Sequence, residues 1–157
     1  MTITVDVSIS DELRADTPES ADDDVPDPAL LQHWAAAAYL DNAPAVASLM
    51  VTSASEIQQL NKQYRDKDTS TNVLSFPMQS PAEVDIRLLG DIVLCPAVIN
   101  QQAKQQAKSA VSHWAHMVVH GMLHLQGYDH MEKDEAEIME QLEIKILGRL
   151  KFTDPYQ

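Results

Sequence analysis

The run HGMLHLQGYDH at residues 120–130 narrows the possible folds of this chain more than any other part of its sequence. His120 and His124 are four residues apart, so on a helix they lie one above the other on the same face. Gly127 follows three residues later, where a left-handed glycine would end the helix and turn the chain back. The run therefore predicts a helix that ends near residue 126 and a turn that brings His130 close to the other two histidines.

Three imidazoles brought together in this way are typical ligands of a zinc ion. Three protein ligands leave a fourth position open to water, whose pKa a zinc ion lowers to roughly 7. We therefore expect His120, His124 and His130 to hold one Zn²⁺ in a site of the catalytic type, with His120 part of the catalytic centre. Imidazole also accepts other divalent ions such as Ni²⁺, so the sequence leaves the identity of the metal open.

Two neighbours of this run allow more than one interpretation. Asp129 would either accept a hydrogen bond from the ring N–H of a ligand or lie exposed in the turn. His116 lies one helical turn before His120 and is a candidate for contact with the ligands or the substrate. A packed or solvated histidine is the simpler interpretation of His116.

Gly121 argues against a peptidase. Zinc peptidases with the H-E-x-x-H motif place a general-base glutamate directly after the first histidine, where this chain has Gly121. A peptidase would need a base from elsewhere, for example Glu135. Phosphodiester hydrolysis depends more on charge stabilisation, which a metal ion and a guanidinium provide. Arg65 is the candidate guanidinium, because it lies where a predicted helix leads into a polar loop; an arginine exposed to solvent in that loop is the alternative.

The remaining patterns predict an α/β fold with layered α+β character. Alternating or apolar β-prone runs indicate strands at 3–9, 46–51, 72–76 and 88–94. Helices are predicted at 29–40, 109–126 and 133–147, and a further helix is predicted after Pro96. Ser53 and Glu56 have the spacing of a capping box, which predicts a helix that ends near Arg65. Gly127 and Gly148 are predicted at the ends of the last two helices. The order β-α-β-α-β-β followed by helices predicts a four-stranded mixed sheet covered by helices, with the metal site on the long C-terminal helix and the turn after it.

Length and composition indicate one domain spanning residues 1–157, with 11–28 as an acidic solvated loop. The formal net charge is −13, which at first argues against a nucleic-acid partner. Residues 52–112 nevertheless carry six basic and six acidic residues, so a local positive face remains possible. The lone Cys95 and the absence of a signal-like or membrane-spanning apolar run predict a cytoplasmic protein.

The sequence resembles the YbeY family of bacterial endoribonucleases in four ordered blocks. These are YRDKDTSTNVLSFP at 64–77, LLGDIVLC at 88–95, SHWAHMVVHG at 112–121 and the histidine run itself. The resemblance implies a four-stranded mixed sheet with helices, metal ligands at His120, His124 and His130, and a functionally required arginine at Arg65. The acidic segment 11–28 lies outside the four blocks.

The resemblance also implies a zinc-dependent hydrolase that cleaves single-stranded RNA, matures the 3′ end of 16S ribosomal RNA and takes part in 70S ribosome quality control. Its expected partners are single-stranded RNA, ribosomal RNA and the small ribosomal subunit with its assembly factors; neither DNA nor a membrane is expected. The alternative is an assembly factor that binds the ribosome or RNA, in which the metal stabilises the fold and catalysis is slight.

Overall fold

The computed structural model describes residues 3–11, 13, 24–79 and 85–156. Its strands are β1 (Ile3–Ile9), β2 (Ala45–Val51), β3 (Val73–Pro77) and β4 (Arg87–Leu94). Its helices are α2 (Pro28–Ala37), α3 (Ala54–Arg65), α4 (Pro96–Gln105), α5 (Ala110–Leu125) and α6 (Lys133–Arg149). The predicted order of strands and helices is confirmed.

The four strands form one mixed sheet in the order β1-β2-β4-β3. Strand β2 pairs in parallel with both β1 and β4, and β3 pairs with β4 in the antiparallel direction at one edge. Parallel neighbours need a crossover between them, and α2 supplies the one that joins β1 to β2. The predicted four-stranded mixed sheet is therefore confirmed.

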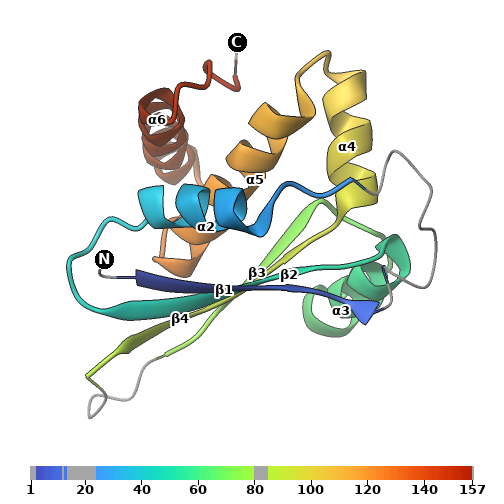
Figure 1. Cartoon of the computed structure of the whole chain (residues 1–157), viewed down its shortest axis with the longest axis horizontal. Helices are drawn as coiled ribbons and strands as arrows, with labels where there is room; N and C mark the ends of the chain where they lie inside the picture. The colour runs from blue at the N-terminus through green and yellow to red at the C-terminus, as the bar shows by residue number, and fades with distance from the viewer. Residues whose placement is uncertain (1–2, 12, 14–23, 80–84, 157) are drawn as a thin grey trace.

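Helices cover the two faces of the sheet unequally. Figure 1 shows α2, α5 and α6 on one side of the strands and α3 on the other. The larger core lies on the first side, where Trp34, Trp114 and Met122 are buried with the inward side chains of the sheet. A smaller core lies on the second side, where Ile57 of α3 packs near Val93. Helix α5 is thus held between the sheet and the other helices, which fixes the histidine run.

Local sequence explains most helix ends. Asp27 caps α2 by accepting a hydrogen bond from the Ala29 N–H at 2.9 Å, and Pro28 occupies the first helical position. Ser53 caps α3 by accepting from the Glu56 N–H at 3.2 Å. The Glu56 carboxylate accepts hydrogen bonds from Ser10 and Thr52, so the predicted capping box is only half formed.

Two predicted helix ends differ from the structure, and a third prediction lies partly outside the described residues. Gly148 does not end a helix, because α6 continues to Arg149 and the left-handed position after it is taken by Lys151, with φ of +74°. Helix α2 ends at Ala37 and not at residue 40. The acidic segment 11–28 is described only in part; Leu13 within it is buried, while residues 12 and 14–23 lie outside the described residues.

No helix among the described residues is long and apolar enough to cross a membrane.

Candidate functional site

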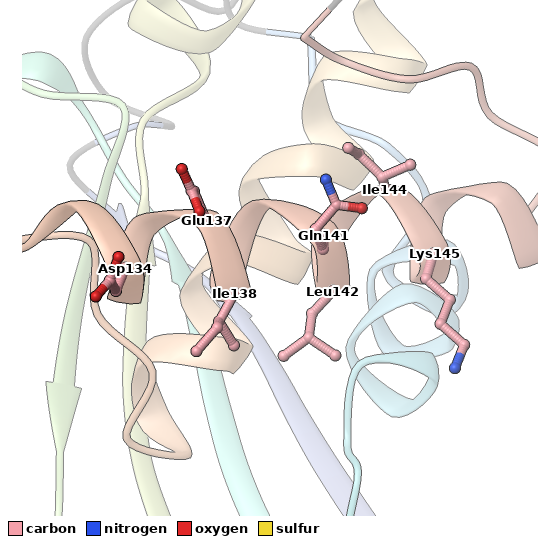
Figure 2. A pocket seen from close by; sticks show the side chains of 7 residues that line it. All are labelled: Asp134, Glu137, Ile138, Gln141, Leu142, Ile144 and Lys145. Carbon is pink, nitrogen blue, oxygen red and sulfur yellow. The ribbon is translucent and has the colours of Figure 1, made fainter.

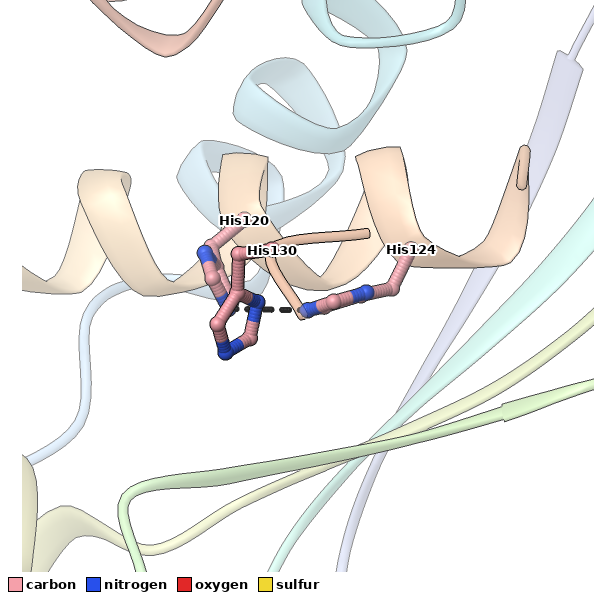
Figure 3. A group of neighbouring side chains, drawn as sticks. All are labelled: His120, His124 and His130. Carbon is pink, nitrogen blue, oxygen red and sulfur yellow. Dashed lines mark hydrogen bonds between the residues drawn. The ribbon is translucent and has the colours of Figure 1, made fainter. Parts of the chain in front are cut away.

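Helix α5 carries two of the three histidines predicted as ligands. It begins at the N-cap Ser109, whose hydroxyl accepts a hydrogen bond from the Ser112 N–H at 3.1 Å. His120 and His124 follow one turn apart on the same face, with ring centroids 4.5 Å apart. Figure 3 shows their Nε2 atoms directed at each other, 3.0 Å apart.

The chain turns back immediately after α5. The Gly127 N–H donates to the His124 carbonyl at 3.0 Å, and the Tyr128 N–H donates to the Leu123 carbonyl at 3.1 Å, which together form a Schellman motif. Gly127 has φ of +100°, a conformation that residues with side chains rarely adopt. The motif returns His130 to the helix, where its ring centroid lies 5.0 Å from that of His124.

The turn brings the three histidines into one cluster (Figure 3). One ring nitrogen of each residue lies within 4.8 Å of the others. The His130 side chain is 56% exposed and that of His120 only 21%, so the cluster opens to solvent on the His130 side. Three converging nitrogens with one open side have the arrangement of a catalytic zinc site.

The hydrogen-bond partners of the rings fix which nitrogens can bind a metal. His120 Nδ1 lies 3.1 Å from Glu143 Oε1, and His124 Nδ1 lies 2.9 Å from the Tyr128 carbonyl oxygen. An ionised carboxylate and a carbonyl only accept hydrogen bonds, so each Nδ1 donates one and the Nε2 of each ring is the nitrogen available to a metal. Burial, followed by the charges of His120 and His130, lowers the pKa of His124 and favours this neutral form.

A hydrogen bond between the two Nε2 atoms requires a proton on one of them, and a bound metal ion would take the place of that proton. Zinc binds imidazole nitrogen at about 2.0–2.1 Å, and two nitrogens of a tetrahedral site are then about 3.3 Å apart. The His120 and His124 Nε2 atoms, 3.0 Å apart, therefore need only a small movement to hold such an ion. The residues present fit a zinc ion.

Arg65 is the last residue of α3, and the end of that helix directs it at the edge strand. Asp66 takes a left-handed conformation with φ of +58°, which ends α3 and starts the loop to β3. The Arg65 Nη2 donates to the Ser75 carbonyl at 2.5 Å, and its Cζ lies 5.7 Å from the centre of the Phe76 ring. Both contacts hold the guanidinium beside β3.

One cleft of about 910 Å³ joins Arg65 to the histidine cluster. Arg65 and the residues of β3 line one part of it, and His120, His124 and His130 line another. Lys67 is the second basic residue among its lining residues. Of the basic residues in segment 52–112, Arg65 and Lys67 therefore lie at this cleft, whereas Arg87 pairs with Asp41 at 3.6 Å.

Comparison with known proteins agrees with this geometry. Residues 28–151 match the family model described as Endoribonuclease YbeY. The chain belongs to the YbeY family of endoribonucleases. A protein named Endoribonuclease YbeY from Idiomarina loihiensis is 46% identical over 159 residues, which cover 99% of this chain and 92% of that protein.

A solved structure shares the fold. The solution structure of TM1509 from Thermotoga maritima superposes with a TM-score of 0.51 at 22% identity, covering 98% of this chain and 99% of that one. At this identity the likeness supports the α/β fold alone.

The sequence did not single out Glu143, which the structure puts at the centre of a second cluster in this YbeY-family chain. Its side chain is 1% exposed, and its carboxylate accepts hydrogen bonds from His116, His120 and Tyr156. Burial alone would raise the pKa of Glu143, but the hydrogen bonds and charges of the two histidines outweigh it and lower the pKa to about 2. Glu143 is therefore a buried anion.

A signal for Glu143 was present in the sequence. Met139, Glu143 and Ile146 lie on the buried face of α6, so Glu143 occupies a position where the helical pattern calls for an apolar residue. An acid at such a position needs partners, and the partners are histidines of α5. The many other acids of α6 make this position inconspicuous in the composition of the helix.

The two ambiguous residues have distinct environments. His116 is buried, and its Nε2 contacts Glu143, so it lies next to the ligands through that carboxylate and does not line the cleft with Arg65. Asp129 accepts a hydrogen bond from the His130 backbone N–H at 2.7 Å, while its carboxylate is 4.0 Å from His130 Nδ1. Asp129 therefore stabilises the turn, and the oxygens that accept from ligand rings belong to Tyr128 and Glu143.

The residue after the first histidine has a packing function. Gly121 faces β4, and a Cβ built there would lie 3.1 Å from two atoms of Ile92. A glutamate at this position would point into the core and not at the histidine cluster. Glu135, the alternative base of a peptidase, is exposed on α6 and does not line the cleft.

Helix α6 presents a different surface on its outer side. A shallow concavity of about 720 Å³ lies along this helix. Figure 2 shows the side chains that line it, which are those of Asp134, Glu137, Ile138, Gln141, Leu142, Ile144 and Lys145. None of the histidines of the cluster lines it. This concavity is separate from the candidate site.

Proposed function

We propose that this protein is a zinc-dependent endoribonuclease that hydrolyses phosphodiester bonds of single-stranded RNA. The observation that carries the proposal is the single cleft that contains a guanidinium at one part and three converging imidazoles at another. Membership of the YbeY endoribonuclease family supports the same reaction. Its substrate in this proposal is the 3′ end of 16S ribosomal RNA, with a further part in 70S ribosome quality control.

Each residue of the cleft has a defined task in this proposal. His120, His124 and His130 would hold the metal ion through one ring nitrogen each. The ion would supply Lewis-acid chemistry, which makes a water or ribose hydroxyl a better nucleophile and stabilises charge on the phosphate. Arg65 carries five N–H donors, more than the Ser75 carbonyl takes up, and binds phosphoryl oxygens as their charge grows in the transition state.

In this proposal the lining of the cleft favours RNA over peptides as the substrate. Gly121 offers no side-chain base, and the carboxylate among the described lining residues, Asp129, accepts a hydrogen bond from the His130 backbone N–H in the turn. A phosphodiester places its negative charge where Arg65 and Lys67 can bind it. The small ribosomal subunit and its assembly factors are the partners that this substrate implies, and the cytoplasm is the compartment where they assemble.

The test uses protein purified free of contaminating nucleases and loaded with zinc. A single-stranded oligoribonucleotide with the 16S 3′-end sequence should be cleaved, and the same sequence as a duplex or as DNA should be cleaved far more slowly. A chelator should stop cleavage, and added zinc should restore it. Intact single-stranded RNA in the presence of zinc would refute the proposal and favour a binding factor without catalysis of its own.

A further inference from the structure

We propose that Glu143 is a positioning residue that fixes the ring of His120 for metal binding. The inference rests on the proposed metal site and concerns a residue outside the three ligands. Glu143 extends from α6 into the interface with α5, where its side chain is 1% exposed. Its Oε1 accepts from His120 Nδ1 at 3.1 Å, which leaves Nε2 of that ring to point at His124.

The position of the carboxylate is itself fixed from two further directions. Its second oxygen accepts a hydrogen bond from His116 Nε2, one turn earlier on α5. The same oxygen accepts from the hydroxyl of Tyr156 at 2.8 Å, near the C-terminal end of the chain. Three donors from two parts of the chain therefore converge on one buried anion, which matches the carboxylate–histidine–metal arrangement that orients ligands in other metal sites.

The hydrogen bond that Glu143 accepts from Nδ1 fixes the tautomer of His120. A carboxylate accepts from both histidines at once, so both rings carry their protons on the nitrogens that face it. A glutamine at this position would accept through its oxygen but donate through its nitrogen. The ring that faces the glutamine nitrogen would then carry its proton on the opposite ring nitrogen. In His120 that opposite nitrogen is Nε2, which points at His124. In His116 it is Nδ1, which is buried and has no hydrogen-bond partner.

A second arrangement of the same atoms is possible in principle. Ring nitrogens of His116 and His120 and an oxygen of Glu143 lie within 4.8 Å of one another, close enough to share an ion. Such a site would use His120 Nδ1 and break the hydrogen bonds that now bury the carboxylate. The two arrangements make opposite predictions, because this one needs His116 and the proposed one needs His124.

The experiment compares zinc affinity, measured by competition with a chromogenic chelator, in the full-length protein and its variants. Glu143→Gln should bind zinc about 10-fold to 100-fold more weakly than the wild type. Glu137→Gln removes the same charge from an exposed position of α6 and should leave the affinity unchanged. Nitrogen-15 NMR of the histidine rings should find His120 protonated on Nδ1 in the wild type, with a changed proton distribution in Glu143→Gln.

Tyr156→Phe provides a second variant in case Glu143→Gln fails to fold. It removes one hydrogen bond to the carboxylate and keeps the ring and the charge, so it should weaken zinc binding by about twofold to tenfold, the equivalent of one net hydrogen bond. Thermal unfolding of the zinc-free variants separates an effect on the fold from an effect on the metal.

The outcomes are distinguishable. Wild-type affinity in a folded Glu143→Gln, or in Tyr156→Phe if the former does not fold, would overturn the positioning function. Loss of zinc in His116→Gln with retention in His124→Ala would overturn it as well, in favour of an ion held by Glu143 itself. A wild-type protein that binds no zinc would instead refute the proposed function on which the inference rests.

Discussion

Replacing Gly121 by alanine tests why a glycine follows the first histidine. The added Cβ would lie 3.1 Å from Cδ1 and from Cγ2 of Ile92, a fully buried side chain on the inner strand β4. Overpacking of this kind costs about 1–3 kcal/mol, while alanine gains about 1 kcal/mol over glycine in a helix. The free energy of unfolding should therefore fall by about 0–2 kcal/mol, and the midpoint of thermal unfolding by about 2–4 °C for each kcal/mol.

Gly148→Ala is the matched control, because Gly148 lies in α6 and a Cβ added to it would meet no atom within 4 Å. This variant should gain about 1 kcal/mol from helix propensity alone, so the two alanine variants should differ by about 1–3 kcal/mol. Both are measured by urea unfolding of the zinc-free protein. Ile92→Val removes the Cδ1 atom that the added Cβ would meet, so in this background Gly121→Ala should lower the free energy of unfolding by less. Equal stability of the two alanine variants, or an unchanged cost beside Ile92→Val, would refute the packing explanation.

Three further predictions concern the metal and pH. Chelation should lower the midpoint of thermal unfolding. Zinc at a hundred times its dissociation constant should raise the free energy of unfolding by about 2.7 kcal/mol and the midpoint by about 5–10 °C. An unchanged midpoint would contradict the metal site. Gly127→Ala should weaken zinc binding measured by calorimetry. Gly127 has φ of +100°, which strains any residue with a side chain, and the turn that it forms positions His130. Wild-type zinc affinity would contradict this function of the turn. Burial, followed by the charges of His116 and Lys108, lowers the pKa of His113 to about 4. Between pH 6.5 and 4 the unfolded chain therefore binds a proton at His113 that the folded chain does not bind. Stability of the zinc-free protein should therefore fall as the pH falls through this range, and His113→Gln should reduce the slope; an equally steep curve would exclude His113 as the cause.

The histidine cluster could be predicted because its geometry is local. His120, His124 and His130 lie within eleven residues, and one helix and one glycine turn determine their separation. The strands were predictable for a similar reason, since Ile3 to Ile9 alternate between a buried and an exposed face. Gly148 was predicted wrongly because a glycine near a helix end does not stop the helix when the next residues can continue it.

The parts that could not be predicted depend on contacts between distant segments. Glu143 lies 23 residues after His120, and only the packing of α6 against α5 joins them. The contact that holds Arg65 is a backbone carbonyl of Ser75, which no side-chain pattern can indicate. Because these contacts depend on how elements pack, the sequence predicted the histidine cluster but not the groups that orient its rings.

The proposed reaction requires a metal held by the three histidines and a contact from Arg65 to the phosphate. Zinc content and the rate of single-stranded RNA cleavage, measured on identical preparations of the wild type, His124→Ala and Arg65→Ala, test both parts at once. His124→Ala should lose zinc and cleavage together, whereas Arg65→Ala should keep its zinc and cleave RNA about 100-fold to 1,000-fold more slowly. Cleavage at the wild-type rate by a zinc-free His124→Ala, or by Arg65→Ala, would contradict the proposed reaction.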